Sequence, residues 1–192
     1  MSLDQLAVIL LAAGRGSRFG ADKLLWPVGG CALGEYAAQP LRRFPFKIAV
    51  TAPGGIDYSA LGFVSVVNHE AAAGMAGSLR LGVRRARRHG AQAVVVALAD
   101  MPFVPERHYD DLLSRYRGAD TLAASVAAHR SPPALFGAGW FDRLETLHGD
   151  RGAGTLLAEA EAVPCPARWL ADIDRREDLA TFDAAPPPAQ GG

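Results

Sequence analysis

The chain has very little cysteine. Its 192 residues include only two, Cys31 and Cys165, which lie far apart and in no metal-ligand spacing. This spacing argues against a disulfide framework and a structural zinc site, and each thiol is expected to be a buried structural residue. Such thiols are typical of a reduced compartment.

An excess of charge of one sign is also absent, because 20 basic residues balance 20 acidic ones. A neutral chain has no overall basic field for a polyanion, so nucleic acid is not an expected partner. No apolar run is long enough to span a bilayer, and the run at residues 6–13 lacks the cationic flank of a secretory signal. We therefore expect a cytoplasmic protein that does not contact membranes.

The composition provides enough apolar sequence for a substantial core, with 49% hydrophobic and 21% charged residues. No repeat and no long linker divides the chain. We expect one domain over residues 4–183, followed by a disordered tail rich in proline and glycine over residues 184–192.

Apolar runs alternate with amphipathic segments along this domain, which is typical of an α/β fold. The expected strands are residues 6–12, 46–52, 63–67, 92–98 and 121–127, and the expected helices are residues 76–89, 105–117, 137–147 and 153–161. The pattern predicts a three-layer α/β/α sandwich with a mostly parallel sheet, less regular in its second half.

A glycine-rich loop follows the first expected strand and is the strongest functional signal. Small residues let backbone N–H groups approach phosphate oxygens, while Arg15, Arg18 and Lys23 add positive charge. Open α/β sheets bind ligands at the carboxyl ends of their strands, where this loop lies. The residues expected to bind a nucleotide here are Leu11, Ala12, Ala13, Gly14, Arg15, Gly16, Ser17, Arg18 and Lys23.

Two commoner glycine motifs do not fit this loop. A dinucleotide fingerprint that starts at Gly14 needs a third glycine where the chain has Phe19. In a P-loop the lysine directly follows a glycine and precedes serine or threonine, whereas Lys23 follows aspartate and precedes Leu24. From this motif alone, an ordinary turn between strand and helix remains the alternative.

One carboxylate, Asp100, comes just after the expected strand at residues 92–98 and just before Pro102. A hard cation such as Mg²⁺ takes one or two carboxylates together with phosphate oxygens, and proline stiffens the turn that presents this side chain. The alternative is an N-cap for the helix expected from Pro105. With the phosphate loop beside it, Asp100 is the predicted metal ligand.

Small and polar residues begin the expected helix at residues 76–89. Backbone N–H groups at a helix start can face a base or ribose, so Gly74, Ser78 and Arg80 are candidate nucleotide-binding residues. The alternative is a first-turn serine and a solvated arginine. The arginines farther along this helix favour a solvated face over a binding patch.

Two later segments carry charges that have both a functional and a structural interpretation. Asp150 and Arg151 are adjacent and lie between glycines, which also fits an Asp-capped helix. Asp172 and Asp174 form an acidic pair, which also fits carboxylates that cap the last helix.

These five motifs, spread from residue 10 to residue 179, resemble in order those of the MobA-like molybdenum-cofactor nucleotidyltransferases. Four of them match the family patterns L-A-A-G-x-x-S-R-F/M-G-x-x-K, G-M-x-x-S-L-R-x-G, S-G-D-R-G-A-R and D-I-D-T-P-E-D-L, and the fifth is the strand end at Asp100. The chain departs from them at His148, Gly154 and Arg175-Arg176. The order of the motifs is more specific than any one of them.

The resemblance implies a Rossmann-like fold of the nucleotide-diphospho-sugar transferase type. It also implies Mg²⁺-dependent transfer of a nucleotidyl group from CTP or GTP to the phosphate of molybdopterin, with release of pyrophosphate. The sequence Leu11-Ala12-Ala13-Gly14 is similar to the cytidylyltransferase form, so CTP is the expected donor. By the same resemblance Asp172 and Asp174 lie near the metal, and Asp150 and Arg151 lie on the acceptor side.

The acceptor side is where the chain departs most from the family. Relatives have Gly-His/Asn-Pro before a strand, whereas this chain has Ser131-Pro132-Pro133. Proline offers no donor from its backbone or side chain. We therefore expect either that His129 or Arg130 supplies the missing contact, or that the acceptor is not molybdopterin.

A phosphate acceptor is already ionised near neutral pH, so the predicted catalysis consists of positioning and charge. Arg18 and Lys23 are expected to steady the β- and γ-phosphates, and Asp100 to hold Mg²⁺. One alternative keeps the chemistry with GTP, or with a sugar or alditol phosphate as acceptor. A second alternative is a non-catalytic pterin carrier that docks on a client molybdoenzyme or chaperone. A third is a dinucleotide-binding oxidoreductase, which Phe19 disfavours.

Overall fold

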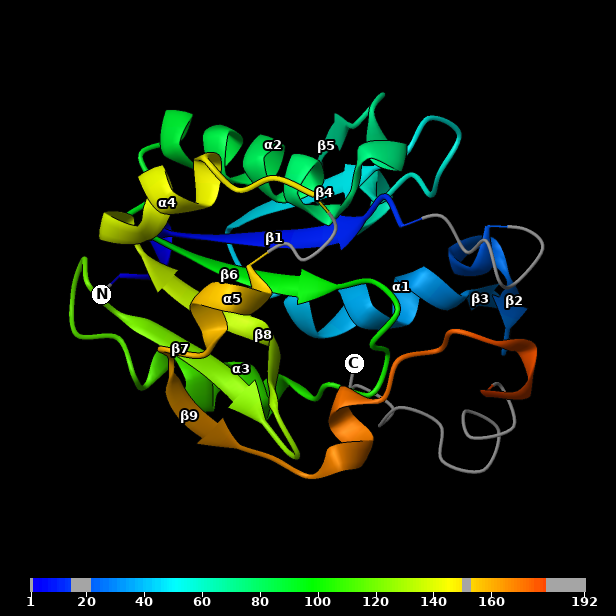
Figure 1. Ribbon diagram of the computed structural model, residues 1–192. Helices are drawn as coiled ribbons and strands as arrows, with labels where there is room; N and C mark the ends of the chain where they lie inside the picture. Colours follow the sequence, from blue (N-terminus) through cyan, green and yellow to red (C-terminus); the bar gives the residue numbers. More distant parts are fainter. Residues whose placement is uncertain (1, 15–21, 150–152, 179–192) are drawn as a thin grey trace.

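The computed structural model describes residues 2–14, 22–149 and 153–178. These residues form the predicted three-layer sandwich, with a seven-stranded sheet in the order β5-β4-β1-β6-β8-β7-β9 (Figure 1). The strands are β1 (Leu6–Ala12), β4 (Phe46–Thr51), β5 (Val64–Val67), β6 (Ala93–Leu98), β7 (Leu122–Val126), β8 (Arg130–Gly137) and β9 (Glu161–Pro164). A separate small hairpin pairs β2 (Pro27–Val28) with β3 (Cys31–Ala32).

The sheet is mostly parallel, as the sequence predicts. β1 pairs in parallel with β4 on one side and with β6 on the other, and β5 and β9 are also parallel to their neighbours. Only β8 runs against the strands beside it within the described sheet. The carboxyl ends of β1, β4, β6 and β7 therefore lie at one edge, and β8 begins at that edge.

Helices cover both faces of the sheet. α2 (Met75–Arg88), α4 (Phe141–Glu145) and α5 (Gly154–Leu157) pack on one face, while α1 (Leu33–Ala38) and α3 (Glu106–Leu113) pack on the other (Figure 1). None of the helices in the described ranges combines the length and apolarity needed to cross a bilayer.

The burial of β1 explains its apolar sequence. All seven of its residues are buried, because alternate side chains point to opposite helical layers. Ile9 packs toward Leu79 and Val83 of α2, whereas Leu10 belongs to the core that contains Leu112 of α3. A strand with two apolar faces is typical of a parallel sheet centre.

Close packing between α2 and the sheet depends on Gly82. A Cβ added at Gly82 would lie 2.5 Å from Cγ2 of Ile9 and 3.3 Å from Cγ2 of Val50. The absence of a side chain lets the helix lie directly on β1 and β4, and so sets the position of its first turn at the carboxyl edge.

Two predicted helices differ from the structure. Residues 137–147 do not start as a helix, because Gly137 is the last residue of β8 and pairs with Ala93; α4 begins only at Phe141. Residues 153–161 yield the short helix α5, because Glu161 already pairs with β7 as the first residue of β9. In both segments, strand pairing takes residues whose local pattern is helical.

Candidate active site

The carboxyl edge of the sheet holds a pocket of about 450 Å³. Its walls come from the end of β1, the short turn at Lys23, the start of α2 and the end of β6. Among the predicted nucleotide-binding residues, the lining includes Leu11, Ala13, Gly14, Lys23, Gly74 and Ser78. Asp100 also lines it, so the phosphate-loop strand, the expected metal ligand and the helix start meet in one place.

Part of the predicted site lies outside the described residues. Arg15, Gly16, Ser17 and Arg18 fall in the gap after Gly14, and Asp150 and Arg151 fall in the gap before Ala153. Their roles therefore stay predictions from sequence.

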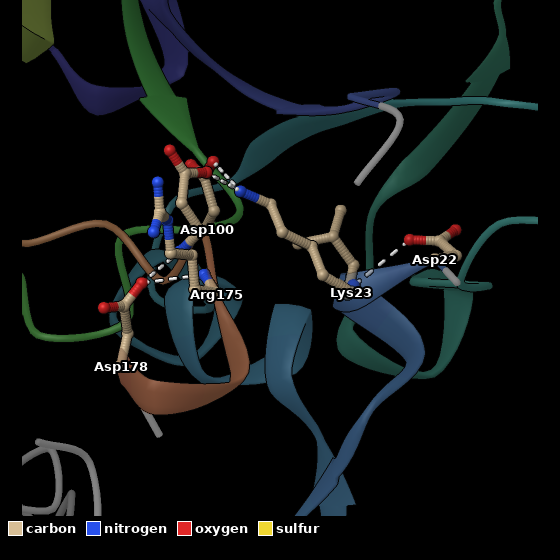
Figure 2. Close-up of polar contacts among 7 residues, drawn as sticks. Asp22, Lys23, Asp100, Arg175 and Asp178 are labelled. Atoms are coloured by element: carbon tan, nitrogen blue, oxygen red, sulfur yellow. Dashed lines mark hydrogen bonds and ion pairs between the residues drawn. The ribbon is translucent and has the colours of Figure 1, made fainter. Parts of the chain in front are cut away.

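Lys23 connects distant parts of the chain at this pocket. Its Nζ donates to Oδ2 of Asp100 at 2.8 Å and to Oδ1 of Asp174 at 2.5 Å (Figure 2). The lysine is 6% exposed. Burial by itself lowers the pKa of Lys23, but the two carboxylates outweigh burial and raise the pKa above its usual value. The ammonium is thus held charged between two anions.

The local turn that presents Lys23 begins at Asp22. The side chain of Asp22 accepts a hydrogen bond from the backbone N–H of Leu24 at 3.1 Å, which caps the 3₁₀ turn Lys23–Leu25. Figure 2 shows Asp22 and the ammonium of Lys23 on opposite sides of this turn. Asp22 therefore fixes the turn that presents Lys23.

The acidic pair is fixed by the residue between its two members. Ile173 is 1% exposed and packs with Leu33 and Phe103, and its N–H donates to the carbonyl of Asp100 at 3.0 Å. This anchor brings the segment from Asp172 to Asp174 beside the end of β6.

Asp178 fixes the same segment by hydrogen bonds to its backbone. Its Oδ2 accepts from the backbone N–H groups of Asp174 and Arg175, at 2.9 and 2.7 Å (Figure 2). Ile173 and Asp178 match the family pattern D-I-D-T-P-E-D-L, but neither is a predicted site residue. Their signal in the sequence is a single apolar residue between two aspartates and an aspartate four positions after the second one.

The two carboxylates that hold Lys23 suit a divalent cation. One oxygen of Asp100 and one of Asp174 already converge on a single positive charge, and hard cations prefer such oxygens. The described residues contain no cluster of three or more His, Cys, Asp or Glu arranged for a metal. An ion here would therefore complete its coordination with water or with oxygens from a substrate, which is the usual pattern for Mg²⁺.

Asp172 differs from its neighbour in its surroundings. Burial raises the pKa of Asp172, and the nearby charges of Asp174 and Asp100 raise it further. It makes no ion pair with Lys23. The structure thus brings Asp174 into the ion-pair cluster and leaves Asp172 at its margin.

The start of α2 lines the pocket with Gly74, Met75 and Ser78. Gly74 precedes the helix with φ of +108°, a conformation that favours glycine, and no side chain caps the helix there. The first backbone N–H groups of a helix lack partners within it and carry partial positive charge. Of these, the N–H of Ala76 is used by the carbonyl of Gly149, at 3.2 Å.

Arg80 contacts the protein in this structure. Its guanidinium donates to the carbonyl of Leu147 at 3.2 Å, and with the Ala76–Gly149 bond it holds residues 147–149 against α2. Arg80 does not line the described pocket. Its placement joins α2 to the segment that leads to Asp150.

The predicted acceptor residues lie where β7 ends and β8 begins. His129 and Arg130 are exposed, and Nε of Arg130 donates to the carbonyl of Ala160 at 2.9 Å. Pro133 is buried, and its carbonyl accepts from the hydroxyl of Ser125 at 2.7 Å. Both residues lie at the carboxyl edge of the sheet, beyond β6 from the pocket, and their role on the acceptor side stays a prediction.

The arginine-rich side of α2 is occupied by acidic partners. Arg84 pairs with Glu145 at 3.2 Å, and Arg87 pairs with Asp142 at 2.6 Å and with Glu145 at 3.1 Å. These pairs attach α2 to α4, which agrees with a solvated structural face.

Comparison with known proteins identifies the family. The model of the MobA-like NTP transferase domain matches residues 8–163. The molybdenum cofactor guanylyltransferase of Rhodobacter capsulatus is 30% identical over 191 residues, covering 92% of this chain and 94% of that protein. The purine catabolism protein PucB of Bacillus subtilis is 25% identical over 177 residues, with 84% of each chain covered.

A solved structure shows the same architecture. A nucleotidyl transferase from Methanothermobacter thermautotroptrophicus superposes with a TM-score of 0.76, covering 93% of this chain and 95% of that chain. At 20% identity this likeness shows the fold. It agrees with the Rossmann-like nucleotide-diphospho-sugar transferase fold that the motifs imply.

Proposed function

The chain belongs to the MobA-like NTP transferase family, and on this premise we propose that it transfers CMP from CTP to the phosphate of molybdopterin. The observation that carries the proposal is the cluster of Lys23, Asp100 and Asp174, because Lys23 and Asp100 line the same pocket as Gly14. Such a cluster suits a reaction in which phosphates are positioned and their charge is neutralised.

The proposed reaction is a single displacement at phosphorus. An oxygen of the acceptor phosphate attacks the α-phosphorus of the nucleotide, the bond from this phosphorus to the bridging oxygen breaks, and pyrophosphate leaves with that oxygen. The acceptor is ionised near neutral pH, so no serine, cysteine or histidine nucleophile is needed. Lys23, together with Arg18, steadies the leaving pyrophosphate.

Asp100 and Asp174 would hold Mg²⁺, and Asp172 is near enough to assist through its charge. When bound, the ion would supply charge neutralisation at the α-phosphate. The chain's own residues orient the reactants: the start of α2 receives the nucleoside, and the edge near His129 and Arg130 receives the acceptor. Arg80 holds the segment that leads to Asp150 against α2 through the carbonyl of Leu147.

The choice of CTP rests on Leu11-Ala12-Ala13-Gly14, which is similar to the cytidylyltransferase form. GTP is the second candidate, because the Rhodobacter capsulatus relative is a guanylyltransferase and covers nearly the whole chain. A sugar or alditol phosphate remains the alternative acceptor, since Pro132 cannot donate a hydrogen bond. The two thiols are free, which supports a reduced compartment such as the cytoplasm.

A product analysis tests the proposal. The protein is incubated with molybdopterin cofactor, Mg²⁺ and each of CTP, GTP, ATP and UTP, and the products are identified by mass spectrometry. A cytidine dinucleotide of molybdopterin, formed faster than the guanosine product, supports the proposal. Formation of the guanosine dinucleotide alone would replace CTP with GTP, and no pterin dinucleotide with any nucleotide would overturn the acceptor.

A further inference from the structure

Asn68 is a buried polar residue beside the pocket to which the sequence analysis gave no role. It follows β5 directly, is 4% exposed, and its backbone N–H donates to the carbonyl of Thr51 on the neighbouring strand β4. Its side chain faces the first turn of α2. A buried amide of this kind is expected to be fully hydrogen-bonded, and its bonds determine its orientation.

The two ends of the Asn68 amide have different partners. Oδ1 accepts from the backbone N–H of Glu70 at 3.0 Å, and Nδ2 donates to the hydroxyl of Ser78 at 2.9 Å. A backbone N–H is only a donor, so turning the amide over would place two donors against each other at Glu70. The amide nitrogen must therefore face Ser78.

This orientation decides which way the Ser78 hydroxyl points. Ser78 Oγ accepts from Asn68, so its own hydrogen must be directed elsewhere. Within the described residues this hydroxyl has no protein acceptor, although Ser78 is 4% exposed and lines the 450 Å³ pocket. A buried O–H with no protein acceptor is unfavourable unless a ligand or water in the pocket supplies one.

From this chain of contacts we infer that Asn68 is a positioning residue: it fixes the Ser78 hydroxyl as a donor into the pocket. Its target is an acceptor atom on the nucleoside part of the substrate, such as a ring nitrogen, a base carbonyl or a ribose oxygen. This inference rests on the proposed function, because it takes the occupant of the pocket to be a nucleotide.

Replacing the amide by a carboxylate reverses this hydrogen bond with little change in shape. In Asn68→Asp, the Glu70 N–H keeps its acceptor, but the carboxylate cannot donate. The Ser78 hydroxyl then donates to Asp and offers only lone pairs to the pocket. In contrast, if Asn68 had only a structural role, any side chain that accepts from the backbone N–H of Glu70 could replace it.

The test measures the binding of CTP and of inorganic tripolyphosphate by calorimetry, with thermal melting to verify folding. Asn68→Asp should weaken CTP binding by roughly 3- to 10-fold, the value expected for one neutral hydrogen bond. Ser78→Ala should weaken it as much, and the double variant Asn68→Asp/Ser78→Ala should bind no more weakly than Ser78→Ala. Tripolyphosphate should bind all four proteins within about twofold, because it has no nucleoside.

Three results would overturn the inference. The first is an unchanged CTP affinity in Asn68→Asp. The second is a loss of tripolyphosphate affinity equal to the loss of CTP affinity, which indicates charge repulsion. The third is a loss of CTP affinity on Asn68→Asp that persists in the Ser78→Ala background. If Asn68→Asp does not fold, Asn68→Ala and its Ser78→Ala double variant give the same cycle, with coupling expected and additivity contradicting the inference. A wild-type protein that binds no nucleotide at all would overturn the proposed function together with the inference.

Discussion

Lys23 and Asp174 form an ion pair across 151 positions of sequence, with 2.5 Å between Nζ and Oδ1. The same ammonium lies 2.8 Å from Oδ2 of Asp100. A lysine thus occupies the position where the two carboxylates would hold a divalent cation. For a nucleotide and a metal to bind together, the ammonium must leave these oxygens and move to the phosphates.

This geometry predicts opposite effects of Lys23→Met on metal binding and on turnover. Without nucleotide, the variant should bind Mn²⁺ or Mg²⁺ roughly tenfold more tightly, because a charged competitor for the carboxylates is gone. Turnover should fall on the order of 10²-fold or more, because a preorganised charge on the leaving pyrophosphate is lost. Calorimetric titration with Mn²⁺ and steady-state assays measure the two effects.

The matched control for this variant is Lys47→Met. Lys47 is the other lysine of the chain, is also buried, and donates to the carbonyls of Phe44 and Arg42 away from the carboxylates. The Lys47→Met variant should bind the metal with the wild-type affinity. If Lys23→Met binds metal no better than Lys47→Met does, the two cations do not share the carboxylate position.

Ile173→Ala should loosen the acidic pair. Ile173 is buried with Leu33 and Phe103, so its truncation should lower the free energy of unfolding by roughly 2 kcal/mol or more. Metal affinity should fall in the folded variant, because the segment that carries Asp174 loses its anchor. Leu144→Ala, in the core on the α2 face, controls for a general loss of stability. Equal metal affinity in both variants would show that Ile173 does not position the site.

Gly82→Ala should destabilise the protein although alanine favours helices. The added Cβ would lie 2.5 Å from Cγ2 of Ile9, and overpacking of this kind costs about 1–3 kcal/mol, against a helix gain of about 1 kcal/mol. Gly77→Ala on the same helix has its nearest contact at 3.6 Å and should be neutral or stabilising. Chemical denaturation compares the two. A stabilised Gly82→Ala protein would mean that α2 can move off the sheet without penalty.

His108 should make stability depend on pH. It is fully buried, and its Nε2 lies 2.7 Å from the hydroxyl of Ser125, which itself donates to the carbonyl of Pro133. Burial lowers the pKa of His108, and the carboxylate of Asp111 opposes the shift only in part. Since the folded-state pKa lies below the unfolded one, its contribution is fully present above about pH 6.5 and is lost as the pH falls through the folded-state pKa.

His108→Gln keeps a donor for Ser125 but cannot take up a proton in this range. Its melting temperature should therefore change less than that of the wild type between pH 7.5 and pH 5, which are chosen to bracket the histidine range of about 6.5. Asp111 is the charged group that faces the ring, and Trp169 packs beside it. Parallel pH profiles of the melting temperature for the two proteins would show that His108 does not cause the loss of stability at low pH.

The sequence predicts the centre of this fold better than its margins. β1 is recognisable because both faces of its seven residues are apolar, and Asp100 because a carboxylate follows such a strand. β8 is not recognisable, since Pro132 and Pro133 lower strand propensity and its pairing with β6 is visible only in three dimensions. Likewise, α1 has only six residues, which are too few to show a helical period in the sequence.

The site shows the same division. Motif order brings Lys23, Asp100 and the acidic pair into one prediction, but the choice of Asp174 over Asp172 depends on how Ile173 packs. Asn68 carries no local signal, because its role arises from contact with a helix ten residues later. Arg80 is a candidate for nucleotide binding by sequence, and its contact with Leu147 is a tertiary relationship.

Pyrophosphate release tests the central claim most directly. The assay compares wild-type protein with Asp100→Ala, using CTP, Mg²⁺ and molybdopterin cofactor, with Asp110→Ala as a surface control away from the pocket. The account predicts release that requires the acceptor, persists in Asp110→Ala and is abolished in Asp100→Ala, while both variants melt near the wild-type temperature. Wild-type-like release by Asp100→Ala would contradict the assignment of this edge of the sheet as the active site.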